Sequence, residues 1–130
     1  MHIAFDFHGV LEKYPEKFKP MMIALKKAGH TVSIMSGPPR DRMLEEVDKA
    51  DYTRYTHYDH LISIVDYLKD FVKVEMWQDP RGNWNTVVES SWWSAKAKLC
   101  NEFGVDVLYD DSIKYHGYFT DSKTLFLLVT

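Results

Sequence analysis

The sequence has almost no cysteine: Cys100 is the only one among its 130 residues. No internal disulfide can form, so we expect a reducing, cytoplasmic setting. The sequence also lacks any run of about 18 consecutive apolar residues, and we therefore expect no membrane partner and no membrane span. The stretch MHIAFDFHGV lacks the basic region and long apolar run of a secretory signal, so none is expected.

An excess of basic residues is absent too. The chain carries 16 Lys and Arg against 19 Asp and Glu, a formal charge of -3. This balance argues against a broad surface for duplex DNA, whereas a nucleotide or a strand end needs only a few local cations. The hydrophobic share of 45% and aromatic share of 15% favour a globular chain, and the length predicts a single domain, residues 1–130.

Short apolar segments alternate with helical ones along most of the chain. We expect strands at residues 2–6, 31–35, 105–109 and 124–129, and helices within residues 20–30, 36–50, 57–70 and 94–104. Alternating apolar positions around DPRGN predict a β-hairpin at residues 72–88. Strands alternating with helices indicate a layered α/β fold with a parallel sheet, whose ligands bind beyond the carboxyl ends of the strands.

Polar residues follow three of these strands. They are Asp6 and His8 after the first, Ser36 and Gly37 after the second, and Asp110 and Asp111 after the third. Lys96 is expected in the first turn of the helix before that third strand. The carboxyl ends of parallel strands meet at one edge of the sheet, so we expect these side chains to converge.

This set of residue types suits phosphoryl chemistry. A carboxylate such as Asp6 can attack a phosphomonoester and form an acyl-phosphate. Mg²⁺ held by Asp6, Asp110 and Asp111 would neutralise the repulsion between the two anions. Ser36 and the N–H of Gly37 would hold phosphate oxygens, and Lys96 would offset the remaining charge.

The segments IAFDFHGVL, VSIMSG, Lys96 and VLYDDS resemble, in this order, the four motifs of the haloacid dehalogenase-like (HAD) superfamily. The resemblance spans residues 2–112. It implies a Rossmann-like three-layer sheet and a Mg²⁺-dependent phosphatase. The segments KAKLC and VDVLYDDS are similar to those of small 5′-nucleotidase-like members, including ones common in phage genomes.

The resemblance assigns roles position by position. It implies that Asp6 is the nucleophile and that His8 stands at the acid/base position, with its backbone carbonyl as a metal ligand. It implies that Ser36 binds phosphate and that Lys96 is the motif-three lysine. Asp111 would be the metal-binding acid, and Asp110 an acid beside the metal ligands. Lys98 is the alternative to Lys96. Arg40, just after motif two, is a candidate contact for a substrate phosphate, with a surface role as its alternative.

His8 departs from the family pattern, in which this position is an aspartate in the phosphatases. An imidazole can also do acid/base work near neutral pH. The sequence therefore leaves two hypotheses open. One is a working phosphomonoester hydrolase for a phosphorylated small molecule or a nucleic-acid end. The other is a weak or inactive HAD-like module that binds metal, phosphate or a partner.

The sequence leaves no room for a large cap domain, and the resemblance to HAD proteins of this kind implies an open site. The predicted hairpin is a candidate flap. Four tryptophans, Trp77, Trp84, Trp92 and Trp93, either pack this region or stack a base of the substrate. The HYDH stretch, residues 57–60, has a metal-like composition, but a surface position at a helix start is the alternative. Cys100 is interpreted as a packing residue.

Overall fold

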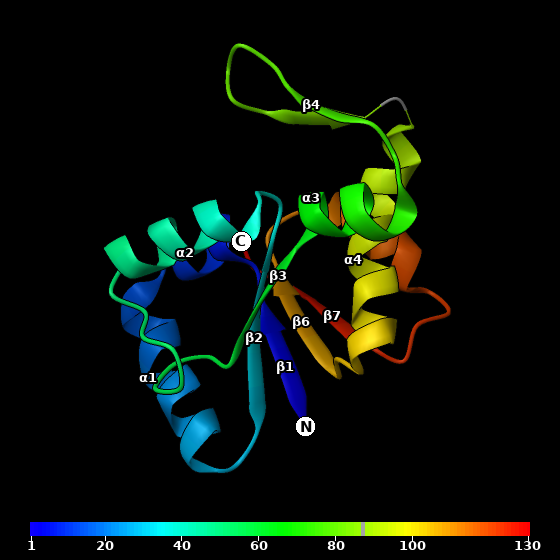
Figure 1. The fold of residues 1–130 in the computed structure, drawn as a ribbon. Helices are drawn as coiled ribbons and strands as arrows, with labels where there is room; N and C mark the ends of the chain where they lie inside the picture. Colours follow the sequence, from blue (N-terminus) through cyan, green and yellow to red (C-terminus); the bar gives the residue numbers. More distant parts are fainter. Residues whose placement is uncertain (87) are drawn as a thin grey trace.

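Residues 1–86 and 88–130 are described by a computed structural model of the chain (Figure 1). Five strands form one parallel sheet in the order β3-β2-β1-β6-β7. They are β1 (His2–Phe5), β2 (Thr31–Ser36), β3 (His60–Ser63), β6 (Val107–Asp110) and β7 (Leu125–Leu128). The predicted α/β class with a parallel sheet is confirmed, as are the four predicted strands.

Helices cover both faces of this sheet (Figure 1). On one face lie α1 (Pro15–Lys27) and α2 (Arg40–Lys49); on the other lie α3 (Ile64–Tyr67) and α4 (Glu89–Phe103). Side chains alternate along each strand, so Ile3 and Phe5 pack with Met22 of α1, whereas Ala4 packs with Leu99 of α4. The sheet therefore has two cores, one on each face.

Three short helical segments complete the fold. They are η1 (Phe7–Leu11), η2 (Leu68–Val72) and η3 (Ile113–Phe119). Only residues 12–14 separate η1 from α1, and only residues 37–39 separate β2 from α2. Neither connection holds an inserted domain. Among the described residues, no helix is long and apolar enough to cross a membrane.

The predicted hairpin is present as the antiparallel pair β4 (Met76–Gln78) and β5 (Trp84–Thr86). The Asp79 carboxylate accepts hydrogen bonds from the backbone N–H groups of Arg81 and Asn83, both at 2.9 Å, and so fixes the turn. The hairpin projects beyond the carboxyl ends of the parallel strands (Figure 1). Val87, also part of the predicted hairpin, lies outside the described residues.

The prediction of one helix over residues 57–70 was wrong. Residues His60–Ser63 form β3, paired in register with residues 33–36 of β2. The helix begins only at Ile64, where the Ser63 hydroxyl accepts a hydrogen bond from the Asp66 N–H at 3.1 Å. The apolar spacing in this segment fits a helix as well as a strand, and the pairing with β2 decided between them.

Two helices begin earlier than predicted. α1 begins at Pro15, so Pro20 lies inside the helix at an exposed position. α4 begins at Glu89, which places Lys96 in the middle of the helix and not in its first turn. The added turn of α4 carries Trp92 and Trp93, and both pack against the core on that face. The packing of these two side chains against the core stabilises the beginning of α4 at Glu89, which the local sequence, rich in serine, does not indicate.

Candidate active site

Asp6 lies at the carboxyl end of β1, where backbone pairing holds it beside β6. Its N–H donates a hydrogen bond to the Tyr109 carbonyl at 2.8 Å. The chain then turns through η1, where Gly9 has φ +79°. A Cβ atom at Gly9 would lie 2.0 Å from Asp111 Oδ2, so the Asp111 carboxylate rests directly against this turn. Glycine is required here both for the left-handed backbone and for the approach of Asp111.

Three carboxylates meet at this point. Asp6, Asp110 and Asp111 each offer an oxygen within 4.8 Å of the others. Asp6 and Asp110 are buried, whereas Asp111 is exposed. Carboxylate oxygens are the ligands that hard cations such as Mg²⁺ prefer. The trio therefore has the composition of a divalent-cation site open to solvent on one side.

Lys96 reaches this trio from α4, and its side chain is only 2% exposed. Its Nζ lies 3.2 Å from Asp6 Oδ1 and also forms an ion pair with the Asp110 carboxylate. The same Nζ lies 4.3 Å from the centre of the Tyr115 ring. Three carboxylates against one ammonium leave two negative charges in excess when all are ionised. A bound divalent cation would balance this excess, and the residues present therefore fit Mg²⁺.

The pKa values of this cluster depend first on burial and then on the neighbouring charges. Burial raises the pKa of Asp6 to about 8; Lys96 opposes the rise, and Asp110 and Asp111 add to it. Burial alone would lower the pKa of Lys96, but the charges of Asp6, Tyr115 and Asp110 raise it above its ordinary value. Lys96 is therefore an ammonium ion, and a further cation at the trio would favour the ionised form of Asp6.

Ser36 and Gly37 lie at the same edge of the sheet, at the end of the neighbouring strand β2. Ser36 is buried. The Gly37 carbonyl accepts a hydrogen bond from the Val65 N–H at 3.0 Å, which ties the turn to α3. A Cβ atom at Gly37 would lie 3.1 Å from the Trp92 ring. The turn that is expected to hold phosphate thus packs against an indole of α4.

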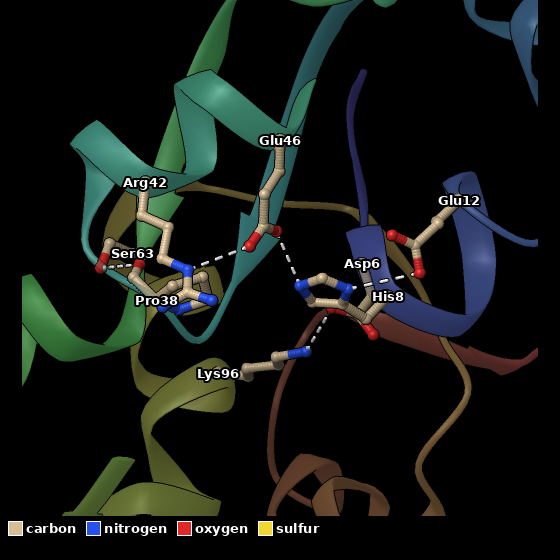
Figure 2. Close-up of polar contacts among 8 residues, drawn as sticks. All are labelled: Asp6, His8, Glu12, Pro38, Arg42, Glu46, Ser63 and Lys96. Atoms are coloured by element: carbon tan, nitrogen blue, oxygen red, sulfur yellow. Dashed lines mark hydrogen bonds and ion pairs between the residues drawn. The ribbon is translucent and has the colours of Figure 1, made fainter. Parts of the chain in front are cut away.

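The His8 side chain is half exposed and lies between two carboxylates (Figure 2). Its Nε2 lies 2.8 Å from Glu46 Oε2, and its Nδ1 lies 3.5 Å from Glu12 Oε1. Glu46 also contacts Arg42, whose Nε lies 3.2 Å from Glu46 Oε1. Sequence reasoning missed Arg42 and Glu46. Their spacing of four residues along a helix was the available signal, because it places both on one face.

A cavity of about 190 Å³ opens beside His8. The cavity is lined by residues of the strand ends, α2, the hairpin and α4: His8, Gly37, Pro38, Arg42, Glu46, Gly82, Asn83, Trp84 and Trp92. The hairpin thus provides part of the wall of the cavity, where the sequence predicted a flap.

The arginine that lines this cavity is Arg42 and not the predicted Arg40. Arg40 is exposed at the start of α2, and its backbone N–H donates a hydrogen bond to Asp66 Oδ2 at 3.0 Å. It lines a different cavity together with His60 and Phe71. The direction in which α2 leaves Pro39 decides which arginine faces His8, and the sequence does not specify it.

Other candidates lie apart from the trio. Lys98 is exposed, in contrast to the buried Lys96. The ring of His57 accepts a hydrogen bond from the Thr53 N–H at 2.8 Å, and His60 begins β3 at the opposite edge of the sheet. Cys100 is buried in the core, where desolvation raises the pKa of its thiol to about 12. These residues are packing or surface residues in this fold.

Comparison with known proteins identified no relative of this chain. No known protein family matches the sequence, and no curated protein was found to be similar to it. Any functional conclusion therefore depends on the residues and their arrangement.

Proposed function

We propose that this protein is a Mg²⁺-dependent phosphomonoester hydrolase of the HAD-like type, acting through an aspartyl-phosphate on Asp6. One observation carries the proposal: Lys96 is buried in contact with both Asp6 and Asp110, and the Asp111 carboxylate lies at the same point. The three acids exceed the single ammonium in charge, and a nucleophile beside a divalent-cation site would use this excess to bind the metal.

The chain's own groups would divide the work as follows. Asp6, Asp111 and the His8 backbone carbonyl would hold the Mg²⁺, with Asp110 beside them bonded to Lys96. When bound, the ion would reduce the repulsion between the carboxylate nucleophile and the phosphate. The Ser36 hydroxyl and the Gly37 N–H would hold the phosphate oxygens. Arg42, at the rim of the cavity, would add a positive charge on the substrate side.

Turnover would take two displacements at phosphorus. First, a carboxylate oxygen of Asp6 bonds to phosphorus while the bond to the leaving oxygen breaks, and that oxygen takes a proton from His8. Second, water attacks the phosphorus of the aspartyl-phosphate while His8 takes up a proton of the water. The bond between phosphorus and Asp6 then breaks, which releases phosphate and restores the carboxylate.

His8 is supported in this role by its two acidic neighbours. Glu46 and Glu12 place an acceptor near each ring nitrogen, at 2.8 and 3.5 Å. These contacts hold the imidazole beside the cavity, and one ring nitrogen would turn from its carboxylate to reach the leaving oxygen. The imidazole would thus take the place of the family's second aspartate.

Phosphate release from a panel of phosphomonoesters tests the proposal. Wild type, Asp6→Asn and the exposed control Asp121→Asn are compared with Mg²⁺ and with chelator. We expect Mg²⁺-dependent release by wild type and by the control, and none by Asp6→Asn. Release that survives in Asp6→Asn would contradict the proposal.

A second candidate function is a binding module of the same fold, favoured by the histidine at position 8. It predicts a silent wild type that still binds Mg²⁺, together with a gain of phosphate release in His8→Asp. Activity of the wild type would reject it.

A further inference from the structure

A second and larger cavity, of about 800 Å³, shares part of its lining with the cavity beside His8. Its walls include the indoles of Trp84, Trp92 and Trp93. The two cavities share Asn83, Trp84 and Trp92 as lining residues, so they adjoin one another. Gly37, whose N–H is proposed to hold phosphate, lines the smaller cavity, so a substrate with its phosphate at Gly37 would extend its leaving group toward an aromatic chamber.

The three indoles are held in different ways. Trp92 donates a hydrogen bond from Nε1 to the Tyr115 hydroxyl at 3.1 Å, and its ring edge rests on Gly37. Trp93 packs on the Tyr115 ring at a centroid distance of 4.9 Å, with Lys114 Nζ 5.0 Å from its own ring. These contacts fix two walls of the chamber.

Trp84 differs from the other two. It comes from the hairpin, and its indole N–H is shielded from solvent yet has no hydrogen-bond partner among the described residues. Because this nitrogen is shielded from solvent, Trp84 would contribute its ring surface to the chamber and not a hydrogen bond. The side-chain amide of Asn83 adds a donor and an acceptor to the lining, whereas the Asn85 amide nitrogen donates within the hairpin to Asp79 Oδ2 and the Asn83 carbonyl.

We propose that this chamber binds the heteroaromatic base of the substrate's leaving group. The substrate is then a nucleoside monophosphate or the phosphorylated terminal nucleotide of a single strand. Indole faces stack on any base, and the Asn83 side-chain amide can pair with the polar edge of one. A sugar phosphate without a base would leave the chamber unused. The inference rests on the proposed function for the phosphate end alone, because the chamber itself is formed by other residues.

Direct binding tests the chamber without any turnover. Adenosine and ribose are titrated into the protein in the presence of chelator, and tryptophan fluorescence is followed. We expect saturable quenching by adenosine and none by ribose. The affinity should fall about ten-fold or more in Trp84→Leu and in Trp93→Leu, because stacking on each indole is lost.

Trp77→Leu is the matched control. Trp77 lies on the same hairpin but lines neither cavity, and its side chain is exposed. Trp93 belongs to α4, so a variant outside the hairpin remains available if Trp84→Leu distorts the hairpin. Adenosine binding that is absent in wild type, or lost equally in Trp77→Leu, would overturn the proposal.

A kinetic comparison separates this inference from the hydrolase itself. The values of kcat/KM are measured for ribose 5-phosphate, adenosine 5′-monophosphate and a 5′-phosphorylated tetranucleotide. We expect wild type to favour the base-bearing substrates about ten-fold or more, and Trp93→Leu, which lines only the larger cavity, to reduce that preference.

The outcomes are distinguishable. Equal kcat/KM for all three substrates overturns the chamber and leaves the hydrolase intact. Adenosine binding without phosphate release from any substrate overturns the hydrolase and supports the chamber. A higher value for the tetranucleotide than for the mononucleotide identifies a strand end as the source of the base.

Discussion

The Lys96 ammonium lies 3.2 Å from Asp6 Oδ1 and pairs at the same time with the Asp110 carboxylate. All three side chains are buried, and they come from α4, the end of β1 and the end of β6. The sheet order places β1 and β6 side by side, so the two acids are neighbours by topology. One cation from the helix layer then lies in contact with both carboxylates.

Removing this cation should strongly destabilise the protein. Lys96→Met leaves two buried carboxylates without their positive partner, a change that costs about 3–5 kcal/mol when a buried pair is broken. Mg²⁺ should restore part of that loss, because it supplies charge at the same carboxylates. Urea unfolding with and without Mg²⁺ measures both effects. The control Lys98→Met, at an exposed position of the same helix, should stay within about 0.5 kcal/mol of wild type. Equal losses in the two variants would contradict the account.

The raised pKa of Asp6 predicts a pH-dependent stability of the metal-free protein. Its pKa is about 8 in the folded chain against an ordinary value of 3.8. Between these values the folded state holds a proton that the unfolded state has lost, so this group's contribution falls as pH rises. The stability of Asp6→Asn relative to wild type should therefore increase from pH 4 to pH 8 in chelator. Thermal unfolding at steps of pH measures the difference, and a constant difference would contradict the prediction.

Gly9→Ala should weaken Mg²⁺ binding as well as stability. The new Cβ would lie 2.0 Å from Asp111 Oδ2 and push that carboxylate away from Asp6. Gly29→Ala is the matched control, because Gly29 has φ +89° with nothing within 4 Å of an added Cβ. Both variants should lose about 1 kcal/mol or more from backbone strain. Only Gly9→Ala should also lose the rise in Tm that Mg²⁺ produces; an unchanged rise would contradict the proposed ligand set.

His8→Asn should slow phosphate release, and the size of the effect should depend on how much the leaving oxygen needs a proton. Loss of a general acid costs about 10²–10⁴-fold for an alkyl phosphate, whose leaving oxygen needs a proton. An aryl phosphate such as p-nitrophenyl phosphate leaves without one, and its release should change much less. The ratio of the two rates in wild type and variant is the measurement. Equal slowing of both substrates would indicate that His8 acts in binding or folding instead.

The strands next to the candidate site could be predicted from the sequence because each is a short apolar run that ends in polar residues. The positions of Asp6, Ser36 and Asp110 follow from that pattern and from the parallel topology. β3 could not be predicted, since the spacing of its apolar residues also fits a helix. Its pairing with β2 is a contact between residues far apart in the chain, which local patterns do not contain.

Where two residues of the same type lie close together in the sequence, only the structure shows which of them lies at the site. Lys96 and Lys98 lie two positions apart on a helix and so face different directions, but only the packing of α4 shows which is buried. In the same way, the start of α2 places Arg42 beside His8 and directs Arg40 elsewhere. The packing of the hairpin strand β5 against α4 brings the hairpin to the cavity beside His8, and it has no local signal in the sequence.

The most direct test of the central claim is to trap the covalent intermediate. The protein is mixed with a substrate and Mg²⁺, quenched in acid within milliseconds, reduced with borohydride and digested for mass spectrometry. An aspartyl-phosphate on Asp6 would be reduced to homoserine at position 6, and this residue should appear only in samples that contain substrate. Phosphate release with no modified residue, or with the modification at Asp110 or Asp111, would contradict the assignment of Asp6 as the nucleophile.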